Sequence, residues 1–374
     1  MTEFSFELLR RRPDVEAENL FAVDAADRLL LDTAAAALAA CAPGEIVTVG
    51  DRYGAVTLGA AAAGSSRLRA HQDARSGELA LANNAAQFGL SDAYRSLPLG
   101  AELLSGARVV LLRMPRSLDA LEEIVDGVLR HASPQVTLYA AGMVKHMALT
   151  MNEVLARGFA EVHAGLARQK ARVVVASGVG TARAGSEWPR REFHRDLGLW
   201  VCAHGGAFAG TRVDIGTRFL LGFLDHAKPD ATWAVDLGCG TGVLASALAT
   251  ARPHLQVLAT DQSAAAVASA EATAEANGVV ERVHVLRDDA LALQPDTSAE
   301  LIVLNPPFHL GAAVHAGGAL RLFQDCARVL APGGELMTVF NSHLRYRSAL
   351  TRLIGPTRQL GRNSKFTVTV STRR

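Results

Sequence analysis

The chain has 374 residues, 49% of them apolar, with a formal net charge of +1 at pH 7 and four cysteines. This length favours two domains over one, and the near-zero net charge excludes nucleic-acid binding by an overall positive surface. The cysteines are scattered without a C-x-x-C pair, so we expect neither disulfides nor a zinc site, and no bound metal. The first 14 residues lack the apolar core of a signal peptide, and we expect a soluble, cytoplasmic protein that does not enter a membrane.

Short apolar runs alternate with helical segments over about 20–175 and again over about 212–374, which is typical of α/β folding. Between them, 177–198 is rich in glycine, arginine and small polar residues and shows little periodicity, which predicts a linker. We therefore expect a first domain over 1–195, including a linker at 177–195, and a second domain over 196–374.

In the second domain, strands are expected to alternate with helices, which predicts a parallel sheet covered on both faces. The strands are expected at 232–236, 255–260, 283–286, 301–304 and 335–340, and the helices at 243–251, 263–277 and 318–330. Ligands of such sheets bind at the carboxyl ends of the strands. Four polar residues lie at those ends, namely Asp236, Asp261, Asp289 and Asn305.

The stretch Asp236–Gly242 reads DLGCGTG and joins the first of these strands to a helix. Backbone N–H groups and the helix dipole at such a junction can hold a carboxylate or a phosphate, and glycine permits close approach of a ligand. Its spacing, G-x-G-x-G, differs from the G-x-G-x-x-G of dinucleotide-binding proteins. Asp261, at the end of the next strand, is well placed to accept both hydroxyls of a ribose. A strand-to-helix turn without a ligand is the alternative.

These residues resemble the class I S-adenosylmethionine-dependent methyltransferases, which implies S-adenosyl-L-methionine as the cofactor. The residues expected to bind it are Thr217, Asp236, Gly238, Gly240, Gly242, Asp261, Asp289 and Ala290. By this resemblance the glycines pass under the methionine part, Asp261 holds the ribose, and the pair at 289–290 meets the adenine. Thr217 lies in 213–221, which resembles the segment of the family that covers the methyl donor.

The stretch 304–309 reads LNPPFH and follows the strand expected at 301–304. An exocyclic amino group or an amide nitrogen is a poor nucleophile because its lone pair is delocalised. The amide oxygen of Asn305 and the carbonyl of Pro306 can accept its N–H groups, since proline has no competing N–H, and Phe308 can stack on a planar acceptor. We therefore expect Asn305, Pro306 and Phe308 to carry catalysis of methyl transfer to a planar amino group. The alternative is a proline that stops a strand.

The first half contains a weaker copy of the glycine loop. The stretch Ile46–Val56 can be aligned with it so that Gly54 matches Gly242. Thr48 then stands where the second half has Asp236, and Arg52 stands in place of a glycine. This alignment predicts an internal repeat whose first copy has lost the donor pocket.

The same alignment places 109–116 opposite LNPPF, with Arg113 in place of Asn305 and Arg116 in place of Phe308. A degenerate methyltransferase-like domain followed by one with NPPFH resembles the ribosomal RNA guanine-N2 methyltransferases. The stretches 341–346 and 363–368 are similar to C-terminal signatures of that family, and 111–118 and 141–147 are similar to both its large- and small-subunit enzymes. Lys170-Ala-Arg-Val favours the large-subunit enzymes.

The resemblance implies two tandem Rossmann-like methyltransferase domains, the first degenerate and RNA-binding, the second catalytic. The implied reaction is methylation of the N2 amino group of a guanine in ribosomal RNA or a ribosomal subunit by a monomer, with 23S favoured over 16S. Residues 336–374 contain eight Lys and Arg and no acid, which fits either a solvated tail or a surface that faces phosphates. The residues expected to contact RNA are Arg113, Arg116, Arg345, Arg347, Arg358 and Lys365.

Three alternatives remain open from the residues alone. NPP followed by an aromatic residue also occurs in amino-group methyltransferases that act on protein glutamine or DNA adenine. A non-catalytic RNA-binding or ribosome assembly factor could retain the fold, although the intact glycine loop and NPPF argue against it. A nicotinamide dehydrogenase is disfavoured by the glycine spacing and by the absence of an evident His or Tyr-Lys pair for hydride transfer.

Overall fold

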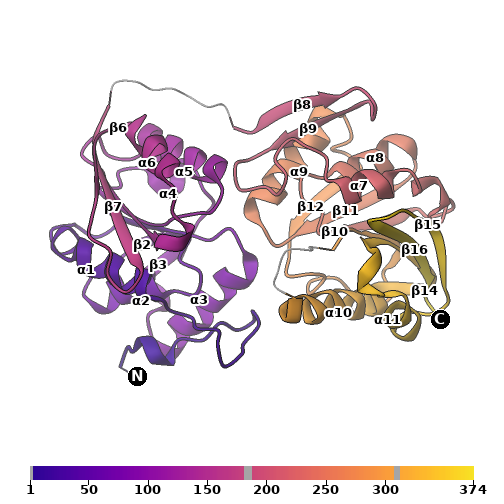
Figure 1. The fold of residues 1–374 in the computed structure, drawn as a ribbon, viewed down its shortest axis with the longest axis horizontal. Helices are drawn as coiled ribbons and strands as arrows, with labels where there is room; N and C mark the ends of the chain where they lie inside the picture. The colour runs from indigo at the N-terminus through magenta and orange to yellow at the C-terminus, as the bar shows by residue number, and fades with distance from the viewer. Residues whose placement is uncertain (1–2, 181–187, 307–311) are drawn as a thin grey trace. The chain divides into compact units, whose positions relative to one another are not determined.

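A computed structural model of the chain describes residues 3–180, 188–306 and 312–374, with the side chains of 312–317 left out of the description. The chain divides into two compact units, Met1–Trp188 and Pro189–Arg374. Each unit consists of a twisted sheet with helices on both faces (Figure 1).

The first unit contains a seven-stranded sheet in the order β3-β2-β1-β4-β5-β7-β6. Strands β1 to β5 run parallel, and β6 and β7 are antiparallel to their neighbours. The strands are β1 (Ile46–Val49), β2 (Leu68–His71), β3 (Tyr94–Ser96), β4 (Val109–Arg113), β5 (Thr137–Met143), β6 (Phe159–Ala164) and β7 (Ala171–Val179). The helices are α1 (Ala25–Ala39), α2 (Ala55–Ala62), α3 (Arg75–Phe88), α4 (Ala101–Leu104), α5 (Leu118–His131) and α6 (Leu149–Ala156).

The second unit contains a seven-stranded sheet in the order β12-β11-β10-β13-β14-β16-β15 and a separate two-stranded sheet, β8-β9. Its strands are β8 (Arg190–His194), β9 (Leu199–Ala203), β10 (Trp233–Leu237), β11 (Gln256–Asp261), β12 (Val283–Arg287), β13 (Ala299–Leu304), β14 (Leu330–Asn341), β15 (Thr357–Arg362) and β16 (Phe366–Thr372). Its helices are α7 (Ile215–Leu221), α8 (Val243–Ala251), α9 (Ala264–Ala276), α10 (Ala312–Val329) and α11 (Arg347–Leu353).

The two large sheets have the same strand order, with β1 to β5 in the first unit matching β10 to β14 in the second. The two central pairs also share a register, because Val49 of β1 lies opposite Leu112 of β4 and Leu237 of β10 lies opposite Leu304 of β13. Arg113 is therefore the structural equivalent of Asn305. The predicted tandem Rossmann-like fold is confirmed, and the internal repeat holds at the level of single residues.

The core of the second unit shows why the parallel strands read as continuous apolar runs. Along β13, Leu301 and Val303 pack into one apolar cluster, while Ile302 and Leu304 pack into another on the opposite face of the sheet. Successive residues of a strand point to opposite faces, so a sheet covered by helices on both sides buries every position. Each fully buried leucine stabilises the fold by roughly 2 kcal/mol.

The predicted linker at 177–198 was wrong at both of its ends. Strand β7 continues to Val179, and residues from Arg190 onward form the β8-β9 hairpin, which belongs to the second unit. The hairpin is attached through α9: Asn277 binds both backbone groups of Trp200, and the hydroxyl of Thr273 accepts from the backbone N–H of Cys202 at 2.9 Å. Four of the five residues of β8 are exposed, which explains why the sequence lacked an apolar pattern there.

Elements of the second unit after Asn305 differ most from the prediction. Helix α10 begins at Ala312 rather than 318, and β14 begins at Leu330, so that the Ala-Pro-Gly-Gly stretch lies within the strand. Helix α11 and the antiparallel strands β15 and β16 were not predicted as elements. Strand β16 pairs with β14 and β15 with β16, which extends the sheet beyond the last parallel strand.

Candidate active site

The glycine loop between β10 and α8 leaves open space at two of its three glycines. Gly238 and Gly240 have φ angles of 69° and 52°, and a Cβ atom added at either one would meet no atom within 4 Å. The backbone N–H of Gly238 donates to the carbonyl of Thr260 at 2.8 Å, which fixes the loop against β11. A ligand can therefore lie directly on the backbone of these two glycines, and the loop fits the expected methionine part of S-adenosylmethionine.

Gly242, the third glycine of the loop, is closely packed rather than open. It is the N-cap of α8 with φ of 73°, and an added Cβ would lie 2.9 Å from both Cα and Cβ of Ala270 in α9. This glycine therefore lets two helices pack closely, and its expected contact with the cofactor stays a prediction.

Asp236, also expected to bind the cofactor, is fully buried. Its Oδ2 accepts from the backbone N–H of Ala245 at 2.9 Å, so it ties the end of β10 to the first turn of α8. Burial, with the charge of nearby Asp261, raises the pKa of this carboxyl group to about 7. This bond supports the loop, while Oδ1 is buried without a hydrogen-bond partner among the described residues, and the contact of Asp236 with the cofactor stays a prediction.

Asp261 ends β11 beside the glycine loop. Its Oδ2 accepts from the backbone N–H of Gly240 at 3.0 Å, and its Oδ1 accepts from that of Ser263 at 2.9 Å. The carboxylate is partly exposed at the carboxyl edge of the sheet, next to the open space at Gly240. This is the position that the sequence predicted for the ribose-binding residue.

The turn after β12 contains Asp289 and Ala290, the pair expected at the adenine. Asp289 forms an ion pair with Arg321 of α10 at 2.7 Å, and its side chain is only 14% exposed. Ala290 has a left-handed backbone with φ of 60°. The neighbouring Asp288 is 3% exposed and accepts from the backbone N–H of Leu293 at 2.9 Å. The Asp289 carboxylate thus has a partner within the chain, and its contact with adenine stays a prediction.

Asn305 lies at the end of β13 with its amide orientation fixed. Its Nδ2 donates to Oδ2 of Asp214 at 3.0 Å and to Oγ1 of Thr217 at 2.9 Å. A carboxylate can only accept hydrogen bonds, so the amide nitrogen must face Asp214. The amide oxygen, Oδ1, is then on the other side, where it is buried and has no hydrogen-bond partner among the described residues. Pro306 follows and is buried, while Pro307 and Phe308 lie outside the described residues.

Asp214 and Thr217 belong to α7, the short helix that precedes β10. Asp214 is the N-cap of this helix and accepts from the backbone N–H groups of Gly216 and Thr217. Thr217, expected to bind the cofactor, accepts from Asn305 through its hydroxyl, and its contact with the cofactor stays a prediction. Asp214 was missed by the sequence reasoning, although an aspartate followed by Ile-Gly-Thr before an apolar run is a helix N-terminus signal. A Cβ at Gly216 would lie 3.2 Å from Asn305 Oδ1, so a side chain here would push against the amide.

The same place in the first unit is filled by an arginine. The guanidinium of Arg113 pairs with Asp24 at 2.8 Å and with Asp27 at 3.2 Å, and its side chain is 13% exposed. A Cβ at Gly50, the equivalent of Gly238, would lie 3.1 Å from the Arg113 carbonyl. The expected RNA contact of Arg113 is corrected, since both ion pairs keep its charge inside the unit.

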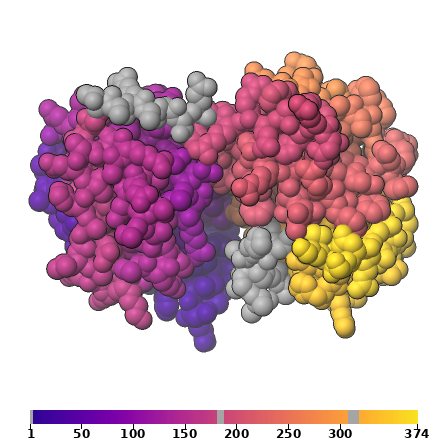
Figure 2. Space-filling model, turned by 45° about the horizontal axis from the view of Figure 1, so that its top comes forward, coloured from indigo at the N-terminus to yellow at the C-terminus, as the bar shows by residue number. Residues whose placement is uncertain are grey.

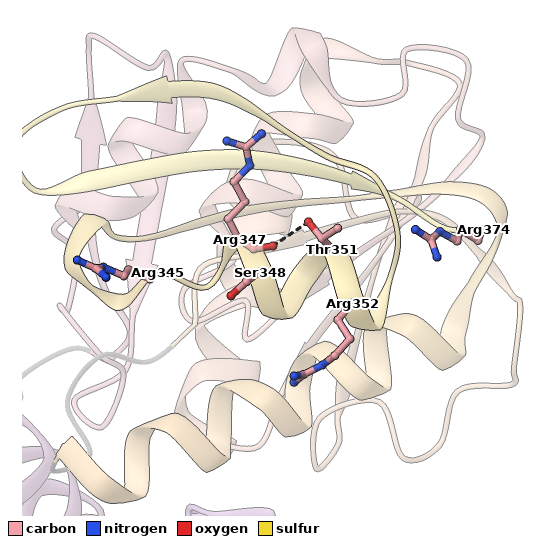
Figure 3. Close-up of a pocket in the computed structure, with 6 residues that line it drawn as sticks. All are labelled: Arg345, Arg347, Ser348, Thr351, Arg352 and Arg374. Atoms are coloured by element: carbon pink, nitrogen blue, oxygen red, sulfur yellow. Dashed lines mark hydrogen bonds between the residues drawn. The ribbon is translucent and has the colours of Figure 1, made fainter.

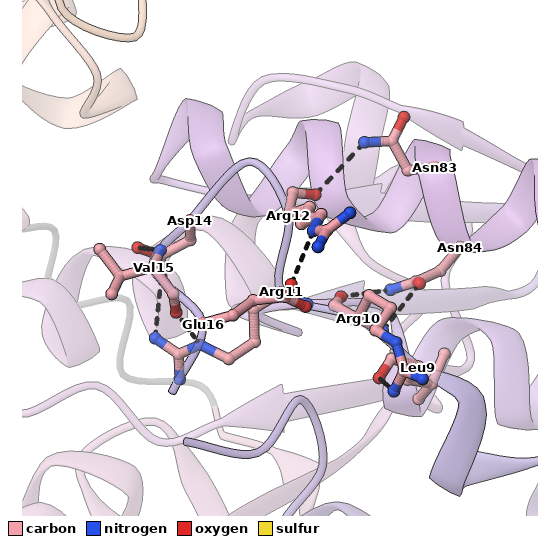
Figure 4. A network of polar contacts seen from close by, with 9 residues as sticks. All are labelled: Leu9, Arg10, Arg11, Arg12, Asp14, Val15, Glu16, Asn83 and Asn84. Atoms are coloured by element: carbon pink, nitrogen blue, oxygen red, sulfur yellow. Dashed lines mark hydrogen bonds and ion pairs between the residues drawn. The ribbon is translucent and has the colours of Figure 1, made fainter. Parts of the chain in front are cut away.

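The loop that replaces the glycine loop in the first unit is bonded to the N-terminal segment of its own chain, and Figure 4 shows the contacts of that segment with Asn84. Tyr53 lies in that loop, and its hydroxyl donates to Asp14 at 2.6 Å. Asn84 of α3 is 1% exposed; it accepts from the backbone N–H of Arg10 and donates to the carbonyls of Arg10 and Tyr53. The N-terminal segment is thereby tied to the loop, where the second unit has open space instead.

The remaining basic residues expected to contact RNA are exposed: Arg116, Arg345, Arg347, Arg358 and Lys365. The C-terminal segment forms part of the outer surface of the second unit (Figure 2). There Arg345, Arg347, Arg352 and Arg374 line a shallow, open depression around α11, and their guanidinium groups spread apart rather than converging (Figure 3). Such a spread suits several phosphates along a strand better than one bound anion.

Among the described residues, no three His, Cys, Asp or Glu side chains lie close enough to hold a metal ion. None of the helices found in residues 3–180, 188–306 and 312–374 is long and apolar enough to span a bilayer.

Comparison with known protein families finds two matches that together cover most of the chain. The family model of the RLMG N-terminal domain matches residues 1–179, and that of the methyltransferase small domain matches residues 198–370. The first match ends before the junction between the two compact units, and the second begins after it.

Curated relatives match over nearly their whole length. The ribosomal RNA large subunit methyltransferase G of Ectopseudomonas mendocina is 37% identical over 367 residues, 97% of this chain and 96% of its own. The protein of the same name from Streptomyces avermitilis is 34% identical over 375 residues, 96% of this chain and 95% of its own. Among solved structures, the T. thermophilus 16S rRNA N2 methyltransferase RsmC, in complex with AdoMet and guanosine, superimposes with a TM-score of 0.74. It is 23% identical and covers 94% of this chain and 92% of its own, so it shares the fold.

Proposed function

The chain belongs to the family of the ribosomal RNA large subunit methyltransferases G, and on that premise we propose that it methylates the N2 amino group of a guanine in large-subunit ribosomal RNA. S-adenosylmethionine is its methyl donor, and the acceptor amine lies at Asn305. The observation that supports this proposal most directly is the buried Oδ1 of Asn305, which has no partner in the described structure and whose direction is fixed by Asp214.

S-adenosylmethionine supplies a methyl group that its sulfonium has already activated. The protein must therefore hold the acceptor in line with the donor and keep water out. Asn305 Oδ1 accepts one N–H of the guanine amine, and the Pro306 carbonyl accepts the other. These two bonds favour a pyramidal nitrogen with its lone pair available for attack. The N–C bond would form as the S–C bond of the donor breaks, S-adenosylhomocysteine would leave, and the methylated nitrogen would release one proton to solvent. A preorganised acceptor of this kind contributes about 3 kcal/mol to stabilisation of the transition state.

On the cofactor side, the open backbone at Gly238 and Gly240 receives the methionine part and Asp261 holds the ribose. Phe308 stacks on the guanine, which must first be unstacked from the RNA if it lies in a helix. The exposed arginines around α11, together with Arg358 and Lys365, hold neighbouring phosphates. We propose that the enzyme acts as a monomer in the cytoplasm on 23S rRNA or on an intermediate of the large subunit.

Total ribosomal RNA from a strain that lacks this gene provides the test. The purified protein and S-adenosylmethionine should convert one guanine of 23S rRNA to N2-methylguanosine, which nuclease digestion and mass spectrometry detect. Asn305→Ala should reduce the rate at least 100-fold while S-adenosylmethionine still binds in calorimetry. Full activity of that variant would refute the assigned role of Asn305.

Two other outcomes of this assay would assign a different function to the protein. Methylation of a protein glutamine or of DNA adenine, with rRNA left unmodified, would assign the same amino-group chemistry to another substrate. A protein that binds rRNA but not S-adenosylmethionine would be an assembly factor.

A further inference from the structure

Asp214 contacts Asn305 in a way that determines which atom of the amide faces the acceptor. Resting on the function proposed above, we infer that Asp214 is a positioning residue for methyl transfer: it holds the Asn305 amide with its oxygen, rather than its nitrogen, toward the guanine amine. The contact joins the N-cap of α7 to the end of β13, two segments 91 residues apart in sequence.

The two partners of Asn305 Nδ2 differ in what they can enforce. The hydroxyl of Thr217 can donate or accept, so it would bond to either end of the amide. The carboxylate of Asp214 only accepts, and a flipped amide would place oxygen against oxygen at about 3.0 Å. That flip would also turn two N–H donors toward an amine that needs an acceptor. Asp214 therefore selects the orientation, and Thr217 supports whichever orientation is present.

One carboxylate oxygen of Asp214 accepts the hydrogen bonds of both the helix cap and Asn305. Its Oδ2 accepts from the backbone N–H of Gly216 at 2.8 Å, from that of Thr217 at 3.2 Å, and from Asn305 at 3.0 Å. The helix cap thus aims the oxygen at the strand end. Gly216 leaves room for it, because a Cβ there would lie 3.0 Å from Asp214 Oδ2.

The first unit contains the same construction without the chemistry. Asp24 is the N-cap of α1 and accepts from Ala26 and Asp27, as Asp214 accepts from Gly216 and Thr217. The residue three positions on, Asp27, also contacts the end of the equivalent strand, which is Arg113. In both units, the N-cap aspartate and the residue three positions after it contact the residue at the end of the strand. Arginine has no acceptor atom, so only the second unit leaves an oxygen for substrate.

This equivalence provides a matched control, since Asp24 has the tie to the strand end and no place in the reaction. Asp214→Ser keeps a strong N-cap but its hydroxyl is one bond shorter and should not reach Asn305. We expect the single-turnover rate to fall about 100-fold at saturating RNA and cofactor, with S-adenosylmethionine affinity unchanged. Asp214→Asn retains an oxygen in the place of Oδ2 and should stay within about threefold of the wild type.

Thr217→Val removes a hydroxyl that does not select the orientation, so its rate should fall by only about three- to fivefold. Asp24→Ser should leave the rate unchanged and lower only the melting temperature. Equal losses for Asp214→Ser and Thr217→Val would indicate a general structural tie and would overturn the inference. Gly216→Ala is a second variant that keeps the cap residue while its Cβ displaces the Asn305 amide; it should lower the rate with the cofactor still bound.

A double-mutant cycle separates positioning from structure. If Asp214 acts only through Asn305, Asp214→Ser should add less than about twofold to the loss already caused by Asn305→Ala. The assay is formation of N2-methylguanosine in total ribosomal RNA from the deletion strain, followed by mass spectrometry. A further full 100-fold loss in that background would refute the positioning role. An inactive wild-type protein would instead remove the proposed function, so the two failures are distinguishable.

Discussion

Gly240 and Gly242 stand two residues apart in the same loop, and the structure predicts opposite consequences for the same substitution. Both have left-handed backbones, with φ of 52° and 73°. An added methyl group at Gly240 would enter open space, whereas at Gly242 it would lie 2.9 Å from Ala270 Cα and Cβ. Gly240→Ala should therefore interfere with cofactor binding, and Gly242→Ala should destabilise the second unit.

The magnitudes follow from backbone strain and overpacking. An alanine in the left-handed region costs about 1 kcal/mol, which applies at both positions. Forcing a methyl group into the packed contact between α8 and α9 adds about 2 kcal/mol at Gly242, because the atoms it meets include backbone. For a unit of this size, 1 kcal/mol corresponds to about 2–4 °C in melting temperature. We expect losses of about 3 °C for Gly240→Ala and about 9 °C for Gly242→Ala.

Differential scanning calorimetry of the full chain, with and without S-adenosylmethionine, measures both effects. The cofactor should raise the melting temperature of Gly242→Ala nearly as much as that of the wild type, because its ligand space is unchanged. It should raise that of Gly240→Ala little or not at all. If the cofactor stabilises Gly240→Ala as strongly as the wild type, the donor does not lie on this glycine, and the assignment of the loop fails.

Two further predictions concern charge. Arg352→Gln and Arg374→Gln should each reduce by about one the slope of the logarithm of the rRNA association constant against the logarithm of the salt concentration. Arg95 is exposed and lies outside the depression, so Arg95→Gln is the control and should leave the slope unchanged. Equal slopes in all three variants would show that the depression around α11 does not contact RNA. Burial raises the pKa of Asp236 from 3.8 to about 7, so the folded unit retains a proton that the unfolded chain releases. The contribution of Asp236 to the free energy of unfolding should therefore fall by up to ~4 kcal/mol as pH rises from about 4 to 7. Urea unfolding at a series of pH values measures this, and Asp236→Asn should make the free energy of unfolding depend less on pH over that range. An unchanged pH dependence in the variant would contradict the prediction.

The repeat explains why one copy lost its ligand space. Arg52 replaces a glycine of the loop, and Tyr53 and Asn84 tie that loop to the N-terminal segment. Arg113 then occupies the strand end with two ion pairs. Where the second unit has open space at its glycines, the first unit has contacts within the chain, so it keeps the sheet without the space for a donor.

Much of the catalytic unit could be predicted because the signals are local. The strand predicted at 232–236 is offset by one residue from β10, the run at 301–304 lies within β13, and helix α8 has the bounds that its pattern predicted. Periodicity and glycine placement act over a few residues, so they can be read without the fold. The β8 strand was missed for the same reason, since its exposed residues carry no apolar period and its position depends on α9, which lies far along the chain.

By itself, the sequence determined the kind of chemistry: a glycine loop between a strand and a helix, an acid at the next strand end, and Asn-Pro-Pro after a buried strand. Only the tertiary structure decided what each residue faces. It showed that Gly242 packs closely against α9 and that Asp236 bonds to the first turn of α8, and it brought Asp214 to Asn305 across 91 residues of chain. The type of a side chain determines which hydrogen bonds it can donate or accept, and this can be known from the residue alone. The choice of partner depends on sheet order and helix packing, which arise from contacts distant in sequence.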